Sequence, residues 1–249
     1  MTSNRVTEQI EVEAVRDLVA AATPNVGVEL RQAGEAIAVR LAALPEVTEL
    51  NRVIGLSSIE ELDELEALYD GDRFAISLYP ESGLDASLAE RGFVAGYSWQ
   101  KFERGAVPLE ARTDLSVEEP RKADDFGAAF AGGYGLPAFV GDWSSRLVRR
   151  AGWHCFVAYD GDEPAGVGAL FTRGSTGWLG FGATLPEKRG RGAQGAILAA
   201  RVNRGADLGL DLLVTETGVP RDDGPGPSYR NILRAGFREA YVRPNYTRP

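Results

Sequence analysis

The chain has 249 residues, of which 44% are hydrophobic and 25% charged, the proportions of a folded protein with one or two domains. Its formal charge of −9 opposes non-specific attraction to nucleic acids or anionic membranes. No apolar run approaches the roughly 18 residues that a spanning helix needs. The lone cysteine, Cys155, cannot form an internal disulfide, and the first ten residues lack the apolar core of a signal peptide. We therefore expect a cytoplasmic protein without nucleic-acid or membrane partners.

The charge is unevenly distributed along the chain. Residues 1–110 carry nine basic and 20 acidic side chains, a formal charge of −11, whereas residues 111–249 carry 18 and 16, a charge of +2. This difference predicts different tasks for the two halves. Residues 186–204 contain five basic side chains and one acidic side chain around several glycines. We interpret this segment as a candidate anion site.

The first half begins with a predicted helix and then alternates strand and helix patterns. Short apolar runs bounded by glycine predict strands, and the acid-rich run that starts at Glu60 predicts a helix. In chain order, the pattern predicts a helix over 12–22, strands over 27–31, 36–41 and 49–55, a helix over 60–69, a strand over 74–79, a short helix over 84–90 and a strand over 92–97.

The second half shows a clearer order of elements. Three antiparallel strands are predicted before a glycine-rich loop, and a parallel strand is predicted after the helix that follows this loop. Ser228 is predicted as the N-cap of the last helix, which Gly236 closes. In chain order, the elements are a strand over 115–118, helices over 122–131 and 142–150, strands over 153–159, 165–171 and 176–185, a helix over 196–208, a strand over 211–218, a helix over 229–235 and a strand over 237–243.

One short motif occurs twice. Gly92-Phe93 and Gly236-Phe237 both follow a predicted helix and are both followed by a tyrosine four residues after the phenylalanine, and the two copies are 144 residues apart. This spacing predicts an internal duplication. We place the boundary near residues 105–112, so that the predicted domains are residues 1–110 and 111–249.

The loop from Arg189 to Gly195 joins a predicted strand to a predicted helix. Glycines let consecutive backbone N–H groups face inward, and the helix dipole favours negative charge at this end, so the loop is suited to phosphate. Residues 190–195 also spell G-x-G-x-x-G, but only one parallel unit follows, which argues against a dinucleotide-binding fold. A phosphate-binding loop of the Walker type ends in Gly-Lys-Ser/Thr, and Gly195-Ala-Ile does not match.

A third phosphate chemistry fits the loop better. Pro186-x-x-Arg189-Gly190-x-Gly192, followed by a helix, a strand and the second Gly-Phe motif, resembles the GNAT superfamily of acyl-CoA N-acyltransferases. The resemblance covers residues 113–249 and, more weakly, the first half. It departs from the family pattern at Gln194, where Gly or Ala is usual. The resemblance implies an α/β fold with a mixed, mostly antiparallel GNAT-type sheet flanked by helices, in two tandem domains.

The resemblance also implies which residues bind CoA. The loop would bind the pyrophosphate, and the strand before it would present backbone groups to the pantetheine arm and the thioester carbonyl. The first half has no arginine-glycine loop at its corresponding junction, Gly55-Leu-Ser-Ser, and we expect it to support or line the acceptor side instead. The expected CoA-binding residues are Ala183, Thr184, Leu185, Arg189, Gly190, Arg191, Gly192, Ala193, Gln194 and Gly195, with Asn231 on the last helix.

Transfer to an amine needs a proton acceptor, because an alkylamine with a pKa of about 10.4 is mostly protonated at pH 7. Glu216, near the end of the predicted parallel strand, is the first candidate. The alternative is a structural carboxylate paired with a nearby arginine. The candidate partners are Arg230, Arg234 and Arg238.

The departing thiolate needs a proton donor. Many relatives in the superfamily carry a tyrosine four residues before the Gly-Phe glycine, but this chain has Ile232 there. Ser228 matches a serine that another branch carries near the thiol, and Tyr229 lies beside it. Ser228 is equally consistent with a plain N-cap.

We therefore expect an acetyltransferase that moves an acetyl group from acetyl-CoA, its co-substrate, directly to an amine, with a small molecule favoured over a peptide. The sequence does not determine the oligomeric state, and a monomer is consistent with it. The missing tyrosine keeps a second hypothesis open, a non-catalytic module that binds CoA or acyl-CoA. His154 and Cys155 lie on a predicted strand without the partners that a metal site needs, so no metal is expected.

Overall fold

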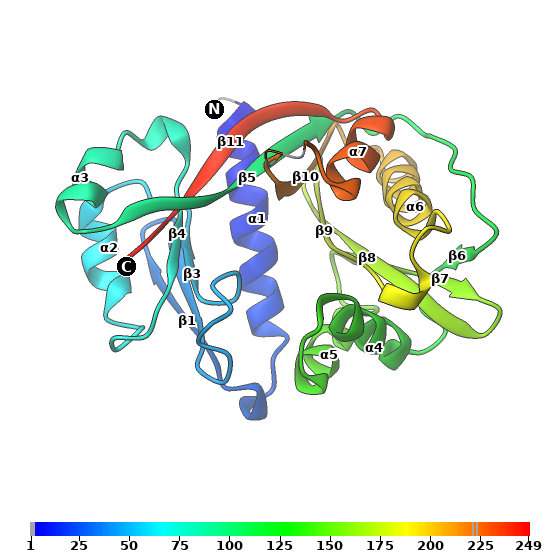
Figure 1. Cartoon of the computed structure of the whole chain (residues 1–249), viewed down its shortest axis with the longest axis horizontal. Helices are drawn as coiled ribbons and strands as arrows, with labels where there is room; N and C mark the ends of the chain where they lie inside the picture. The colour runs from blue at the N-terminus through cyan, green and yellow to red at the C-terminus, as the bar shows by residue number, and fades with distance from the viewer. Residues whose placement is uncertain (1–2, 221, 223) are drawn as a thin grey trace. The chain divides into compact units, whose positions relative to one another are not determined.

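The computed structural model describes residues 3–220, 222 and 224–249 (Figure 1). The chain forms two compact units, each described below by itself. Unit 1 contains residues 1–100 and 241–249, and unit 2 contains residues 101–240. The sequence placed the division near residue 110, whereas the structure places it inside strand β5 (Val94–Arg104) and again inside the last strand, β11 (Arg238–Thr247). In the described part of the chain, the structure contains no helix with the length and apolar character needed to cross a membrane.

Unit 1 is built on a short-stranded sheet with the order β1-β2-β3-β4-β11. Neighbouring strands are antiparallel except β3 and β4, which run parallel with α2 connecting them. Apolar side chains from α2 and the strands form its core, where Leu62 and Leu65 are fully buried. Its elements are α1 (Ser3–Ala20), β1 (Val28–Ala33), β2 (Ala36–Leu41), β3 (Arg52–Ile54), α2 (Ile59–Glu66), β4 (Ala75–Ser77) and α3 (Asp85–Glu90), with 3-10 turns at Pro24–Val26 and Pro80–Ser82.

Unit 2 contains the longer strands and the glycine-rich loop. Its strand order is β5-β10-β9-β8-β7-β6, with α4 and α5 on one face of β8 and β9 and α6 on the other (Figure 1). Its elements are β6 (Ser116–Glu118), α4 (Ala123–Tyr134), α5 (Ala138–Ser145), β7 (Trp153–Asp160), β8 (Glu163–Arg173), β9 (Thr176–Thr184), a 3-10 turn (Pro186–Lys188), α6 (Ala193–Asp207), β10 (Leu212–Gly218) and α7 (Pro227–Arg234).

Most of the predicted elements of unit 2 are confirmed. Strands β7, β8 and β9 are antiparallel and joined by two-residue turns, and β10 is parallel to β9. The helix predicted over 142–150 lies earlier, at Ala138–Ser145, because Leu136-Pro137 ends the turn after α4 and starts the next helix. Ser228 is not the N-cap of α7: Gly226 is the N-cap and Pro227 the first helical residue.

In the sheet of unit 2, the pairing between β9 and the parallel strand β10 ends before the strands do. Strands β9 and β10 are paired only from Leu212–Thr176 to Val214–Trp178. Beyond this point the Thr215 hydroxyl donates to the carbonyl of Leu179 at 2.9 Å. The backbone ladder between the two strands therefore ends before their carboxyl ends, the edge at which sheets of this kind bind ligands.

A β-bulge lies beside this opening. The register of β8 and β9 shifts after the pair Ala169–Gly180 and resumes at Val167–Ala183. Phe181 occupies the bulge with a φ of +58°, a conformation that a bulky residue rarely adopts. Its ring contacts those of Phe130, Trp153 and Trp178, with centroids 5.2–5.7 Å apart.

The same order of elements occurs in both halves of the chain. Strands β1-β2-β3, helix α2, strand β4, helix α3 and strand β5 correspond to β7-β8-β9, α6, β10, α7 and β11. The last strands are exchanged, because β11 pairs with β4 and β5 lies next to β10. The mixed, mostly antiparallel sheet flanked by helices is confirmed, and the mostly parallel sheet of a dinucleotide-binding fold is not present in the described strand pairs.

Candidate functional site

The loop before α6 is an open anion-binding cradle. Gly190 and Gly192 adopt left-handed φ values of +84° and +82°, which glycine allows without strain. Gly192 is the N-cap of α6, and no side chain caps the helix. Within the described chain, the backbone N–H groups of residues 190–195 have no acceptor. Six consecutive amides at the start of a 15-residue helix suit a pyrophosphate group.

The basic side chains around this cradle are mostly occupied. Arg191 lies 2.5 Å from both Asp160 and Asp114, and Lys188 lies 2.9 Å from Asp160 and 2.8 Å from Glu163. The hydrogen bond from Arg191, followed by that from Lys188, lowers the pKa of Asp160 to about 2.

Of the five basic residues that the sequence grouped here, Arg189 alone has no hydrogen bond or ion pair from its side chain within residues 3–220, 222 and 224–249. Arg189 is exposed. The loop therefore presents the unpaired guanidinium of Arg189 to a ligand, whereas that of Arg191 is held by Asp114 and Asp160.

Gln194, which stands where the family pattern has Gly or Ala, has a structural role in this chain. Its side-chain amide donates to the Ser228 hydroxyl at 2.9 Å and accepts from the Asn231 amide at 2.7 Å. These bonds join the first turn of α6 to α7. The structure thus brings three predicted residues together at the edge of the cradle, and Ala193 lies buried beneath it.

The end of β9 approaches the opening through Thr184. The Leu185 N–H donates to the Ala165 carbonyl at 3.0 Å, so this amide is used within the sheet. Since backbone groups alternate in direction along an antiparallel strand, the N–H of Thr184 faces the side that β10 has left. Ala183 is 8% exposed and its methyl group faces Gly133 of α4.

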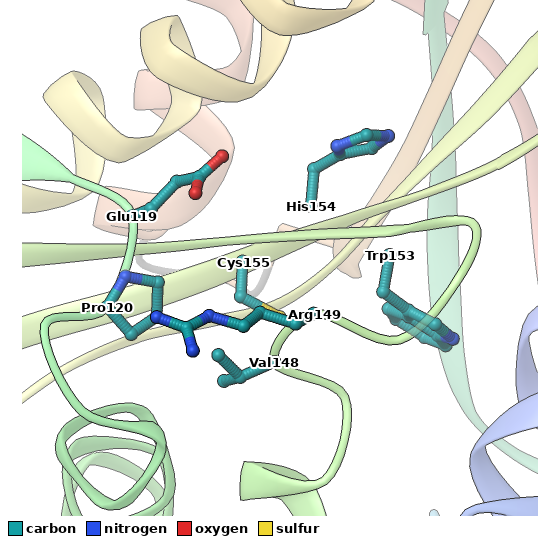
Figure 2. Close-up of a pocket in the computed structure, with 7 residues that line it drawn as sticks. All are labelled: Glu119, Pro120, Val148, Arg149, Trp153, His154 and Cys155. Atoms are coloured by element: carbon teal, nitrogen blue, oxygen red, sulfur yellow. The ribbon is translucent and has the colours of Figure 1, made fainter.

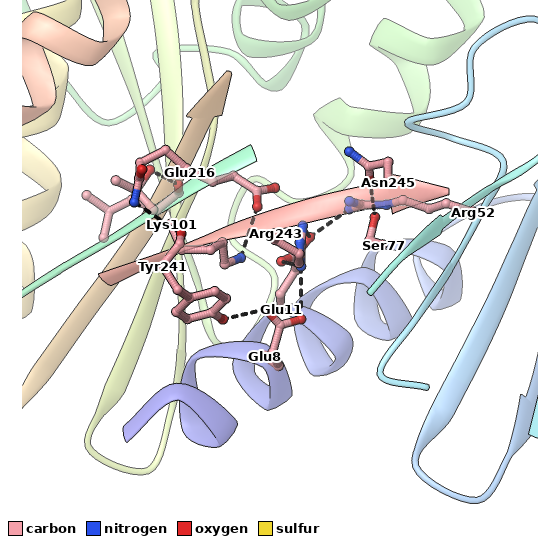
Figure 3. A network of polar contacts seen from close by, with 12 residues as sticks. Glu8, Glu11, Arg52, Ser77, Lys101, Glu216, Tyr241, Arg243 and Asn245 are labelled. Atoms are coloured by element: carbon pink, nitrogen blue, oxygen red, sulfur yellow. Dashed lines mark hydrogen bonds and ion pairs between the residues drawn. The ribbon is translucent and has the colours of Figure 1, made fainter. Parts of the chain in front are cut away.

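Glu216 lies on β10 two residues beyond the last β9–β10 pair. Its carboxylate forms an ion pair of 2.9 Å with Lys101, whose side chain is fully buried (Figure 3). The partner is therefore a lysine of β5, and none of the three arginines that the sequence suggested pairs with Glu216 among the ion pairs of the described chain. The glutamate side chain is 13% exposed at the opening.

Tyr229 points away from the cradle. Its ring packs edge-on against Phe102 at 4.9 Å, the residue is 5% exposed, and its hydroxyl donates to Glu239 at 2.5 Å. Burial and this hydrogen bond raise the pKa of Tyr229 to about 12. The side chains of Ser228 and Tyr229 thus diverge, and Tyr229 serves the core of unit 2.

The sequence analysis missed two polar groups at the β9 bulge. The Tyr134 hydroxyl, at the end of α4, donates to the Gly182 carbonyl at 3.0 Å, and the Arg201 guanidinium of α6 donates to the Gly180 carbonyl at 3.0 Å. The sequence analysis included Arg201 only as one of the five basic residues of 186–204. The Gly-Phe-Gly sequence at 180–182 was the available signal, since glycines in a strand often mark a bulge.

A separate small hollow in unit 2 involves the lone histidine and cysteine. It is lined by Glu119, Pro120, Val148, Arg149, Trp153, His154 and Cys155 (Figure 2). Arg204 donates to Nδ1 of His154 at 3.2 Å, while burial lowers the pKa of the histidine and raises that of the Cys155 thiol to about 12. The described residues contain no group of three or more His, Cys, Asp or Glu side chains placed to hold a metal ion.

The whole chain is similar to solved structures of acetyltransferases. A GCN5-related N-acetyltransferase from Kribbella flavida matches 100% of this chain and 96% of its own at 16% identity, with a TM-score of 0.69. A GCN5-related N-acetyltransferase from Sphaerobacter thermophilus (14% identity, 97% and 94% covered, TM-score 0.59) and a GNAT-family acetyltransferase from Colwellia psychrerythraea (14%, 85% and 80%, 0.56) are similar as well. The chain has the GNAT fold. The sequence itself matches no family model and no curated protein.

The end of the β9–β10 ladder and the glycine loop before α6 form the candidate site of this chain. The resemblance seen in the sequence is thereby confirmed for the fold. At these identities the likeness extends to the fold alone, so the roles of individual residues remain proposals.

Proposed function

We propose that the protein is an acyl-CoA-dependent N-acyltransferase that uses acetyl-CoA and transfers the acetyl group directly to an amine, with a small molecule as the acceptor. The observation that carries the proposal is the row of six backbone amides without acceptors at residues 190–195. This row lies at the start of α6, beside a sheet that opens between β9 and β10. An anion at the helix and an extended arm between the strands describe the shape of CoA.

In this proposal, residues of unit 2 bind the CoA pyrophosphate, orient the thioester and transfer protons. The amides of 190–195 and the free Arg189 bind the pyrophosphate, while Thr184 offers its N–H to the acyl donor in the opening. Glu216 accepts a proton from the amine, directly or through water, and the ion pair with Lys101 holds the carboxylate in place. The amine nitrogen then attacks the thioester carbon, the carbon–sulfur bond breaks, and the thiolate takes a proton from Ser228 or from water.

The test combines binding with turnover. Calorimetric titration with CoA is expected to show one site per chain, and a thiol-release assay with acetyl-CoA over a panel of amines is expected to identify the acceptor class. Binding without turnover on any amine would favour the second hypothesis, a CoA-binding module, which the absence of a tyrosine at Ile232 supports. Absence of CoA binding would exclude both functions.

A further inference from the structure

Arg201 is a buried cation without a carboxylate partner. It lies on the third turn of α6, is 4% exposed, and directs its guanidinium at the underside of β8 and β9. Nε donates to the carbonyl of Ile197 at 3.2 Å, and Nη1 donates to those of Gly180 at 3.0 Å and Ala169 at 3.4 Å. In the described chain its hydrogen-bond partners are all backbone carbonyls, and Nη2 makes no hydrogen bond.

Glycines of β8 and β9 leave room for the Arg201 guanidinium. A Cβ atom at Gly168 would lie 2.9 Å from Cζ of Arg201, so any larger residue there would displace the guanidinium. A Cβ atom at Gly182 would lie 3.5 Å from Nη2, which places this unbonded nitrogen beside the bulge. Burying a cation costs several kcal/mol when no carboxylate compensates it, so core packing alone does not account for an arginine here.

The guanidinium acts on the part of β9 that borders the opening. Arg201 holds the carbonyl at one end of the bulge, Gly180, and Tyr134 holds the carbonyl at the other end, Gly182. Between them Phe181 keeps its left-handed conformation, which persists only where surrounding contacts enforce it. The bulge therefore sets the direction of the backbone groups that follow it, including the N–H of Thr184.

We infer that Arg201 is a positioning residue for acyl transfer, which fixes the β9 bulge through Nη1 and places a positive charge beside the opening. This inference rests on the proposed function. It assigns to the charge of Arg201 and to the backbone of β9 the stabilisation of negative charge that develops on the thioester during attack. No interaction between Arg201 and the pyrophosphate is required, since Arg201 lies eight residues, about 12 Å of helix, beyond Ala193.

The test compares Arg201→Met, Arg201→Lys and, as the matched control, Arg204→Met on the same helix, whose guanidinium bonds His154. We expect Arg201→Met to lower kcat by about 100-fold, the size of effect seen when one preorganised donor is lost. Arg201→Lys should recover part of kcat because it restores the charge. KM for acetyl-CoA and the Kd for CoA should stay within about threefold of wild type, because the amide cradle is intact. Arg204→Met should retain the wild-type kcat.

A second variant keeps the inference testable if Arg201→Met does not fold. Tyr134→Phe removes only the hydroxyl that holds Gly182 from a half-exposed ring, and it should lower kcat with CoA affinity unchanged. Wild-type kcat in a folded Arg201→Met, or a loss of CoA affinity that matches the loss of kcat, would overturn the inference and leave the proposed function standing. A wild-type protein that fails to bind CoA would overturn the proposed function, and the inference with it.

Discussion

The β9–α6 junction of unit 2 and the β3–α2 junction of unit 1 have the same topology. They differ in whether a carboxylate of the chain binds the backbone amides at the start of the helix. In unit 2, the loop between β9 and α6 leaves six amides open and places no acidic residue in the first helical turn. In unit 1, the loop between β3 and α2 is closed by Glu61, whose carboxylate accepts from the backbone N–H groups of Ser57 at 2.8 Å and Ser58 at 3.1 Å. The Ser58 hydroxyl accepts from the Glu61 N–H in return.

This difference shows how a protein cancels an anion site without changing the fold around it. A capping box satisfies the same orphan amides that a phosphate would otherwise bind. The carboxylate of Glu61 occupies the place of the anion and repels any other. Unit 1 thus retains the parallel crossover β3-α2-β4 and has no cradle for CoA.

The largest effect is expected from closing the open junction. Gly192→Asp forces a side chain onto a left-handed residue, where a Cβ atom would lie 2.8 Å from the carbonyl oxygen of Arg112, and it adds a negative charge to the cradle. We expect CoA affinity to fall by more than about 100-fold, measured by calorimetry. Gly174→Asp, also left-handed but in open space at the β8–β9 turn, should bind CoA as the wild type does. Equal binding by both variants would exclude the loop as the phosphate site.

The two units also differ in the residue that follows the paired part of the parallel strand. Two positions after the last strand pair, β10 carries Glu216 whereas the chain after β4 carries Tyr79, so only unit 2 has a carboxylate there. Glu216→Gln should lower kcat by about 100-fold, the usual contribution of a general base, while CoA affinity is unchanged. Glutamine still accepts a hydrogen bond from Lys101, which limits the cost in stability.

The matched control for Glu216 is Glu103→Gln, which changes another nearly buried carboxylate of unit 2, paired with Arg238 at 2.7 Å. Its kcat should equal that of the wild type. A Glu216→Gln enzyme with full kcat across the pH range would leave Glu216 as a structural partner of Lys101 only.

Opening the closed junction should affect stability and not binding. Glu61→Ala removes the acceptor for two backbone amides and half of the capping box, and is expected to lower the free energy of unfolding by about 1–2 kcal/mol in urea titrations. Glu64→Ala, an exposed change on the same helix, should have little effect. CoA should still bind with one site per chain, because α2 lacks the glycine loop. A second CoA site in Glu61→Ala would show that the carboxylate alone closes this junction.

Much of the fold could be predicted because local signals agree with tertiary structure. Both Gly-Phe motifs form the same helix end, with Gly92 and Gly236 at left-handed φ values and the following phenylalanine N–H bonded to a carbonyl five residues earlier. The exchange of β5 and β11 could not be predicted, because strand partners depend on long-range packing that no local pattern encodes. The internal duplication itself stays a prediction.

The candidate site was predicted at the level of its backbone and less well at the level of its side chains. Glycine spacing determines where amides are free, so the cradle at 190–195 was visible in the sequence. The partners of Arg191 lie on β7 and just before β6, and the partner of Glu216 lies on β5. These segments are distant in sequence, so the sequence did not reveal Asp114, Asp160 or Lys101 as partners. The burial of Arg201 against Gly168 could not be predicted, because helical spacing does not show where glycines of a neighbouring strand leave room for a side chain.

Unit 1 also contains charges that its sequence pattern did not reveal. Arg243 is fully buried between Glu8 and Glu11, at 3.0 and 2.7 Å, and Arg52 contacts Glu11 at 2.9 Å (Figure 3). The Tyr241 hydroxyl also donates to Glu8, and burial followed by this carboxylate raises its pKa strongly. Ion pairs join α1 to β11 in this unit, whereas in unit 2 open amides mark the start of α6, the counterpart of α2. A single domain plan thus serves structure in one unit and, by our proposal, ligand binding in the other.

The smallest expected effect is a change in stability at low pH, caused by the ion pair between Arg191 and Asp160 near the open junction. Arg191, and then Lys188, lower the pKa of Asp160 from 3.8 to about 2. A lowered pKa in the folded state adds stability above the unfolded pKa, and this stability is lost as the pH falls from about 4 through about 2. The melting temperature of the wild type should therefore decrease over this window, and Asp160→Asn should decrease less steeply while being slightly less stable at pH 7. Parallel curves for the two proteins would mean that Arg191 is not held by Asp160, and is instead free for phosphate as Arg189 is.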